Sequence, residues 1–185
     1  SKSEDNNVIF DNESWGMSMN QNLYPHLFQP LTEVTESDWQ KVINTNLTGV
    51  FYCMKYELLQ MQKQGRGAIV NNASIGGLRM APGFGAYGPS KAGVIAITQT
   101  AALENADKGI RVNVICPGPT PTPLNTPEKV AEFSTWFAER CAQHMDMSLP
   151  ESSVEDQANA ILFFAEDASA AVTGQYLIVD HGTTI

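Results

Sequence analysis

The sequence AIVNNASIGGLRMAPGFGAYGPSK, residues 68–91, contains the strongest indication of the fold. A short apolar run at its start predicts a buried strand, and the Gly- and Pro-rich residues after it predict a loop. A helix is expected to begin at Ala86 and Tyr87. Tyr87 and Lys91 are four residues apart, so on that helix they lie on one face, one turn from each other. The stretch therefore predicts a strand, a loop and a helix whose first turns present a phenol and an ammonium group.

Ser74, Tyr87 and Lys91 have the side chains of a general acid–base site. An ammonium group beside a phenol stabilises the phenolate and so lowers the phenol pKa from its usual value of about 10. A serine hydroxyl at the end of the neighbouring strand could share a substrate oxygen with that phenol. A Tyr-x-x-x-Lys pair alone is most often an exposed helix surface, so the hypothesis depends on the elements around the pair.

The chain on both sides of residues 68–91 alternates predicted strands and helices. Thr35 is a candidate N-cap for a long helix over 39–64, and a second long helix is expected over 87–107. The other expected elements are three strands and two shorter helices, at 8–10, 110–116, 175–179, 127–144 and 152–165. Strands separated by helices pair in parallel through right-handed crossovers. The expected fold class is therefore α/β, a doubly wound parallel sheet of the Rossmann type, within one partial domain.

Candidate ligand-binding residues follow directly on the expected strands, at Asn12, Ser74, Pro117, Gly118 and Asp180. In open parallel sheets, ligands bind outside the carboxyl ends of the strands. We therefore expect a binding site at this edge of the sheet. Outside the regular pattern lie a polar tail over residues 1–7 and a loop over 15–30, and loops of that length in compact domains are often functional.

The composition is that of an ordinary globular protein, because 43% of its 185 residues are hydrophobic and 17% are charged. The formal net charge of −9 argues against a nucleic-acid or anionic-membrane partner. Cys53, Cys116 and Cys141 have neither metal-ligand spacing nor a disulfide pattern, so free thiols and no metal site are expected. No apolar run approaches the ~20 residues of a membrane span, and the polar first residues are no signal peptide. These features predict a cytoplasmic protein that does not enter the membrane.

Four motifs, in the order in which they occur, resemble the short-chain dehydrogenase/reductase family over residues 8–185. The first is the helix with Asp38-Trp39 and NLTGVF at 46–51. The second is Ser74 followed, thirteen residues later, by Tyr87-x-x-x-Lys91. The last two motifs are GIRVN at 109–113 with CPG at 116–118, and VTGQ at 172–175 with VD at 179–180. Several independent motifs in the right order are stronger support than any one of them.

The resemblance implies an oxidoreductase that uses NAD or NADP and acts on a small-molecule alcohol or ketone. Tyr87 would be the general acid–base, Lys91 would lower its pKa and bind the nicotinamide ribose, and Ser74 would polarise the carbonyl. Asn46 would hold a water that links Lys91 to solvent. The residues implied to contact the cofactor are Tyr87, Lys91, Asn12, Pro117, Gly118, Thr120 and Thr122. The family commonly associates through the two long helices, so a homo-oligomer, dimer or tetramer, is expected.

The resemblance covers the C-terminal two-thirds of the family pattern. No Gly-rich phosphate loop opens a helix after a first strand, so the N-terminal nucleotide-binding half is expected to be missing. Asp11-Asn12-Glu13-Ser14 stands where the family has Asn-Asn-Ala-Gly, and Glu13 adds a negative charge near a diphosphate ligand. A sheet that begins part-way exposes a strand edge, which invites association.

Three functional hypotheses remain. The leading one is an NAD(P)-dependent oxidoreductase that interconverts a secondary alcohol and a carbonyl by Tyr/Lys/Ser acid–base catalysis with hydride transfer. The alternative is a catalytically silent relative that acts through association, which the missing phosphate loop and Glu13 favour. A cofactor-free lyase-type relative resembling the halohydrin dehalogenases is disfavoured, because those carry Arg where this chain has Lys91. The substrate and the choice between NAD and NADP stay open.

Overall fold

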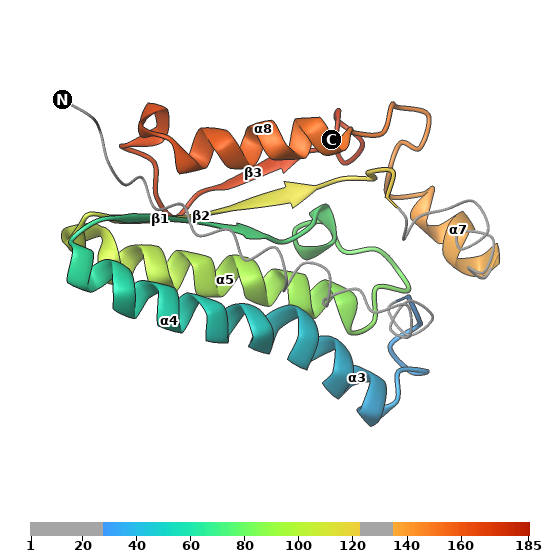
Figure 1. Ribbon diagram of the computed structural model, residues 1–185. Helices are drawn as coiled ribbons and strands as arrows, with labels where there is room; N and C mark the ends of the chain where they lie inside the picture. The colour runs from blue at the N-terminus through green and yellow to red at the C-terminus, as the bar shows by residue number, and fades with distance from the viewer. Residues whose placement is uncertain (1–27, 123–134) are drawn as a thin grey trace.

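The computed structural model describes residues 28–122 and 135–185, which form a parallel sheet between two layers of helices (Figure 1). The helices are α3 (Glu36–Ile43), α4 (Gly49–Gln64), α5 (Tyr87–Asn105), α7 (Thr135–Cys141) and α8 (Val154–Ala165). A π-helical turn (Asn44–Thr48) joins α3 to α4, and short 3₁₀ turns lie at Ile75–Gly77, Ala106–Lys108 and Asp167–Ser169. The strands are β1 (Gly67–Asn72), β2 (Ile110–Pro117) and β3 (Tyr176–Val179).

The three described strands are parallel and lie in the order β1-β2-β3, with Ile69 opposite Val112 and Val114 opposite Tyr176. Helices α4 and α5 cover one face of the sheet and α8 covers the other (Figure 1). The predicted doubly wound parallel α/β fold is therefore confirmed. The strand predicted at 8–10 lies outside the described residues.

The two faces of the sheet have separate hydrophobic cores, because successive side chains of a strand point to opposite faces. On the face covered by α4 and α5, Val112 and Val114 are completely buried. On the other face, Ile115 packs against Ala160 and Phe164 of α8. This double-sided burial explains why residues 114–117 of β2 are all apolar.

The long helix predicted over 39–64 begins at Glu36 and contains an interruption. Thr35 caps it as expected, since its Oγ1 accepts a hydrogen bond from the Asp38 backbone N–H at 3.1 Å. At the π turn, the Gly49 N–H donates to the carbonyl oxygen of Asn44, five residues back. The helix ends at Gly65, whose φ of 69° is a left-handed conformation that glycine adopts without steric cost.

The C-terminal helices agree in part with the expectation. Helix α8 begins at a capping box in which the Ser153 and Asp156 side chains each accept from the other residue's backbone N–H. Of the helix predicted over 127–144, residues 127–134 lie outside the described part. The described remainder, α7, ends at Cys141 and gives way to a turn rather than continuing to His144. None of the described helices is long and apolar enough to cross a membrane.

Candidate active site

The predicted site residues gather at the carboxyl edge of the sheet. Ser74 lies two residues after β1, Pro117 is the last residue of β2, and Asp180 directly follows β3. The strand arrowheads in Figure 1 point to this edge, on the side of the molecule where α7 lies. Asn12, predicted to contact the cofactor, falls outside the described residues.

Ser74 is held by the turn that follows β1. Its Oγ accepts a hydrogen bond from the Gly76 N–H at 3.0 Å and so caps the short 3₁₀ helix. The Ser74 side chain also lies near enough to Tyr87, the first residue of α5, to lower the pKa of the phenol. The two hydroxyl groups predicted to act on one substrate oxygen are thus neighbours at this edge of the sheet.

The pKa of Tyr87 is raised, not lowered as expected from its neighbour Lys91. Burial is the main cause, because removing a phenolate from water is costly, and the hydrogen bond with Ser74 opposes the shift only in part. The ring keeps a little exposed surface, yet enough protein surrounds it for desolvation to dominate. The Lys91 ammonium lies 5.9 Å from the centre of the Tyr87 ring. At that distance it does not offset burial.

Lys91 lies one turn further along α5, and its Nζ donates to the carbonyl oxygen of Asn72 at 3.3 Å. Burial lowers the pKa of Lys91 to about 8. An ammonium group has three N–H donors. The Asn72 bond uses one of them, and within residues 28–122 and 135–185 no second acceptor is found for Lys91. The side chain therefore keeps donors for hydroxyl groups of a ligand.

Cys116 is a further member of this group that the sequence did not assign to the site. It is completely buried on β2 and interacts electrostatically with both Tyr87 and Lys91. Burial raises the pKa of the Cys116 thiol to about 11, against the opposing effects of a hydrogen bond with the Ser74 backbone and of Lys91. The thiol is therefore neutral at physiological pH. Its position next to Pro117, at the carboxyl end of a predicted strand, is the sequence feature that could have placed Cys116 at the site.

Asn46 lies in the π turn and reaches α5 through Ser90. Its Nδ2 donates to Ser90 Oγ at 3.1 Å, and Ser90 Oγ donates to the Tyr87 carbonyl oxygen at 2.7 Å. Both side chains are buried. Asn46 is thus tied to the first turn of α5, which carries Tyr87 and Lys91. Among the described contacts no hydrogen bond joins Asn46 to Lys91 directly.

Two aromatic rings contact Tyr87, from Phe28 and from nearby Phe84, and a third, Phe137, packs against both of them. Phe28 lies 5.3 Å and Phe84 6.0 Å from Tyr87, centre to centre, and Phe137 of α7 lies 5.0 Å from Phe28. Gly83, with a φ of 89°, passes so close to Phe137 that an added Cβ would lie 2.5 Å from its ring. The wall beside the candidate acid–base is therefore apolar.

The segment after β2 crosses the ends of β2 and β3. Gly118 N–H donates to the Val179 carbonyl oxygen at 3.0 Å, and an added Cβ on Gly118 would lie 2.5 Å from the Cβ of Asp180. Thr120 Oγ1 donates to the Gly118 carbonyl oxygen at 3.1 Å. Pro117, Gly118, Thr120 and Thr122, all predicted to contact the cofactor, thus lie at the same edge as Ser74.

Residues 15–184 match the sequence profile of the family described as enoyl-(acyl carrier protein) reductase. Curated relatives with 37% to 41% identity over more than four-fifths of the chain include dehydrogenases and reductases of the same kind. The chain belongs to the short-chain dehydrogenase/reductase family.

Its short-chain dehydrogenase/reductase relatives act on different compounds, as their names state. The chain is 37% identical to a 3beta-hydroxysteroid dehydrogenase of Mediterraneibacter gnavus, covering 82% of this chain and 60% of the relative. It is 40% identical to a cyclohexanol dehydrogenase of Acinetobacter sp. (strain SE19), covering 82% and 57%. It is 41% identical to the 3-oxoacyl-(acyl-carrier-protein) reductase FabG of Thermotoga maritima, covering 84% and 61%. The chain thus spans about 60% of the length of these relatives.

Solved short-chain dehydrogenase/reductase structures are similar over the same region. An NAD⁺-bound xylitol dehydrogenase matches with a TM-score of 0.74 and 32% identity, over 85% of this chain and 64% of that one. ElxO with NADP bound matches with a TM-score of 0.72 and 40% identity, over 84% and 61%. The layered fold described above is therefore that of the family.

Proposed function

We propose that the protein is an NAD(P)-dependent oxidoreductase that interconverts a secondary alcohol and a carbonyl compound. The observation that carries the proposal is the group formed by Ser74, Tyr87 and Lys91 at the carboxyl edge of the sheet. The Ser74 hydroxyl lies near enough to the Tyr87 phenol to lower its pKa, and the Lys91 ammonium lies 5.9 Å from the centre of the Tyr87 ring. Such a group can bind one substrate oxygen and exchange a proton with it.

In this proposal Tyr87 gives its hydroxyl proton to the carbonyl oxygen during reduction and takes a proton from the alcohol during oxidation. The raised pKa of Tyr87 keeps the phenol protonated at neutral pH, which favours its role as the acid in reduction. Ser74 Oγ donates to the same substrate oxygen and stabilises the charge that develops on it. Lys91 stabilises the phenolate left on Tyr87.

The residues present fit the nicotinamide end of the cofactor, which would supply the hydride. Lys91 keeps N–H donors that suit ribose hydroxyls. Gly118 allows a ligand to approach the backbone closely, and Pro117, Thr120 and Thr122 lie beside it. Buried Asn72 Oδ1, for which residues 28–122 and 135–185 provide no hydrogen-bond partner, is a further acceptor at the end of β1. We assign these residues to cofactor binding, with NAD and NADP both allowed.

The test is cofactor binding and ketone turnover with a tyrosine variant. NADH and NADPH are titrated by fluorescence, and reduction of a ketone panel that includes cyclohexanone is followed at saturating cofactor. Tyr87→Phe keeps the ring contacts and removes the proton, so turnover should fall roughly 10²- to 10⁴-fold with cofactor affinity nearly unchanged. Tyr56→Phe, an exposed tyrosine of α4, is the control. If neither cofactor binds and no ketone is reduced, the proposal is wrong.

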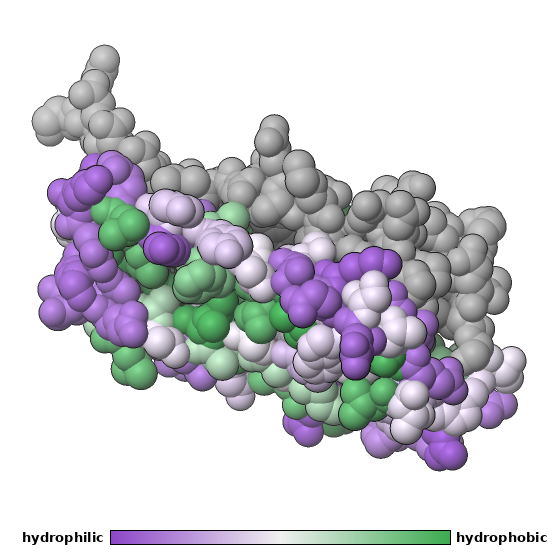
Figure 2. Space-filling view, turned by 90° about the horizontal axis from the view of Figure 1, so that it is seen from below, coloured by the Kyte–Doolittle hydropathy of each residue, from purple (hydrophilic) through white to green (hydrophobic). Residues whose placement is uncertain are grey.

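We further propose that the protein associates with itself through the α4–α5 face. Figure 2 views the molecule from this side and shows apolar side chains gathered between polar borders. Phe51, Tyr52, Tyr56 and Leu59 of α4 and Leu103 of α5 are exposed large apolar residues of these helices. Exposed apolar patches on a helical face are typical of protein interfaces. A catalytically silent relative would also use this face, and its activity would not respond to Tyr87→Phe.

A further inference from the structure

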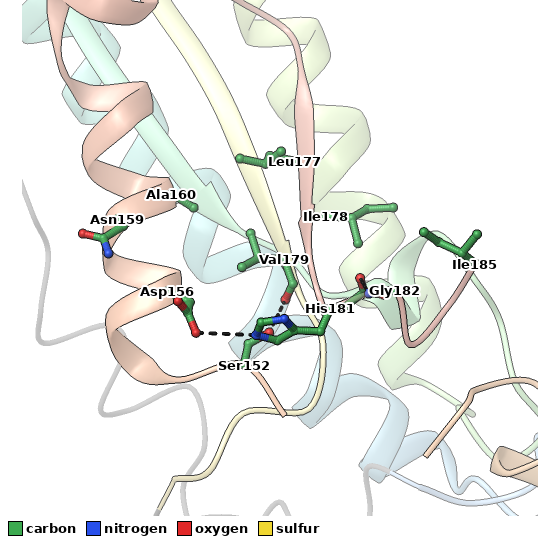
Figure 3. A pocket seen from close by; sticks show the side chains of 11 residues that line it. Ser152, Asp156, Asn159, Ala160, Leu177, Ile178, Val179, His181, Gly182 and Ile185 are labelled. Carbon is green, nitrogen blue, oxygen red and sulfur yellow. Dashed lines mark hydrogen bonds and ion pairs between the residues drawn. The ribbon is translucent and has the colours of Figure 1, made fainter. Parts of the chain in front are cut away.

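One carbonyl oxygen, that of Val179 at the end of β3, accepts three hydrogen bonds from the surroundings of the candidate cofactor segment. The donors are the Gly118 N–H at 3.0 Å, Ser152 Oγ at 3.1 Å and Gln157 Nε2 at 3.1 Å. Figure 3 shows Ser152 beside Val179, with a dashed line marking the hydrogen bond between them. The Ser152 N–H also donates to the Pro119 carbonyl oxygen at 3.0 Å. These bonds hold residues 117–120 to β3 and to the start of α8.

Of the two side chains that donate to the Val179 oxygen, Gln157 is the one that belongs to helix α8. It is 8% exposed, and its Nε2 also contacts Thr120 Oγ1 at 3.3 Å. Thr120 in turn donates to the Gly118 carbonyl oxygen. Gln157 is therefore linked to both backbone polar groups of Gly118. It shares the Val179 oxygen with the Gly118 N–H, and it contacts Thr120, which donates to the Gly118 carbonyl oxygen.

The contacts of Gln157 are poorly suited to a stabilising role. The Val179 oxygen keeps the Gly118 and Ser152 donors when Gln157 is absent, so no buried acceptor would be left without a partner. The Gln157 Oε1 atom is itself buried and has no hydrogen-bond partner in the described part of the chain. A buried amide oxygen without a donor costs free energy. Gln157 thus adds little to the overall stability of the fold, and its contact with Thr120, which Ser152 does not make, is what it adds to the segment.

We propose that Gln157 is a positioning residue that fixes the Pro117–Thr120 segment in the conformation that the nicotinamide end of the cofactor requires. The proposal rests on the proposed oxidoreductase function. The segment lies at the carboxyl edge beside Ser74 and Tyr87, where small displacements of a ligand contact weaken binding and alignment. The unpartnered Oε1 is an acceptor that a donor of the bound ligand can use. Gln157 acts through Gly118 and Thr120 and does not touch the reacting atoms.

The experiment uses Gln157→Met, which keeps the length of the side chain and removes both polar atoms. Its matched control is Asn159→Met, an exposed position on the same helix. Three quantities are measured on the full chain: the thermal midpoint, the exchange rate of the Gly118 amide proton, and KM for NAD(P)H against kcat. For Gln157→Met we expect an unchanged or higher midpoint and Gly118 exchange about tenfold faster. Removing the two hydrogen bonds of Gln157 should raise the cofactor KM about five- to tenfold, with kcat within twofold.

The outcomes separate this inference from the function on which it rests. Unchanged Gly118 exchange overturns the inference, as does an unchanged cofactor KM in an active enzyme. A large drop in thermal midpoint would mean a structural role and would also overturn it. Thr120→Val removes the hydroxyl that Gln157 Nε2 contacts and should raise the cofactor KM in the same way. If the unmodified chain neither binds cofactor nor reduces any ketone, the proposed function fails, while the exchange rate still decides whether Gln157 fixes the segment.

Discussion

Tyr87 and Lys91 have opposite pKa shifts with a common cause. Burial disfavours the charged form of each group, so the pKa of the phenol rises and that of the ammonium falls to about 8. At pH 7 the phenol is therefore protonated, and about 90% of Lys91 is still charged. Both groups are in the form that carbonyl reduction needs. As the pH rises past 8, Lys91 loses its charge before Tyr87 can ionise.

This order of titration predicts the pH dependence of the reaction. The kcat/KM for ketone reduction should be level below pH 8 and fall above it, because only charged Lys91 stabilises the phenolate. Lys91→Arg should be slower at every pH but should lack the fall near pH 8, since a guanidinium stays charged to about pH 12 and beyond. Steady-state rates from pH 6 to 10 provide the measurement. The control is Lys63→Arg at an exposed lysine of α4, which should keep the decrease in kcat/KM above pH 8. If Lys91→Arg also keeps that decrease, a group other than Lys91 causes it.

The π turn between α3 and α4 places a polar side chain in the buried contact with helix α5. Asn46 is buried there, and its Nδ2 has Ser90 Oγ as its partner. A π turn widens the helix locally and is often found at functional sites. Here it brings Asn46 of one element against the first turn of another, the turn that carries Tyr87.

Removing the Ser90 hydroxyl should therefore destabilise the protein. Ser90→Ala leaves the buried Asn46 amide without an acceptor, which costs about 1–3 kcal/mol of unfolding free energy. Thr100→Ala is the matched control, because Thr100 Oγ1 bonds a carbonyl of the same helix but is exposed. Urea denaturation of both variants measures the difference. Equal losses in the two variants would contradict a special role for the Asn46–Ser90 pair.

Arg111 connects β2 to the carboxyl end of α8. Its guanidinium donates to the carbonyl oxygens of Phe164, Ala165 and Glu166 and to Ser169 Oγ, at 2.6 to 3.3 Å. The last carbonyls of a helix have no partner within it, so a cation at this end complements the helix dipole. Ser169 Oγ also donates to the Phe164 and Glu166 oxygens, so Arg111 shares this role with Ser169.

Arg111→Met should lower the unfolding free energy by about 2–3 kcal/mol, the range for hydrogen bonds to a charged group. Arg140→Met, at an exposed position of α7 with one long contact to Gln143, should change it by less than about 0.5 kcal/mol. Both values come from urea unfolding followed by circular dichroism. A loss below about 1 kcal/mol for Arg111→Met would mean that water replaces the guanidinium at the helix end.

The whole fold was largely predictable from local patterns, and the details of the site were not. Strand-length apolar runs predicted β1, β2 and β3, and the Gly- and Pro-rich loop predicted the start of α5. The Thr35 cap predicted the start of the first long helix, and the alternation of elements predicted parallel pairing. Helical periodicity does not distinguish an i→i+4 from an i→i+5 bond, so the π turn was missed. The rise in the Tyr87 pKa also escaped prediction, because it depends on burial by residues such as Phe28, distant in the sequence. Gln157 reaches Thr120 across 37 positions, and no local pattern signals such a contact.

The surface of the whole molecule leads to a prediction about assembly. Leu103 is 83% exposed on α5, and Phe51 is 48% exposed on α4. If this face joins two copies, burying such side chains stabilises the assembly by roughly 25 cal/mol per Å² of apolar surface, and a charge within it is strongly unfavourable. Leu103→Glu should therefore shift the protein to monomer in light scattering coupled to size-exclusion chromatography. Leu31→Glu, 69% exposed ahead of α3, should leave the mass unchanged. An unmodified chain that runs as a monomer at all concentrations would rule out this use of the face.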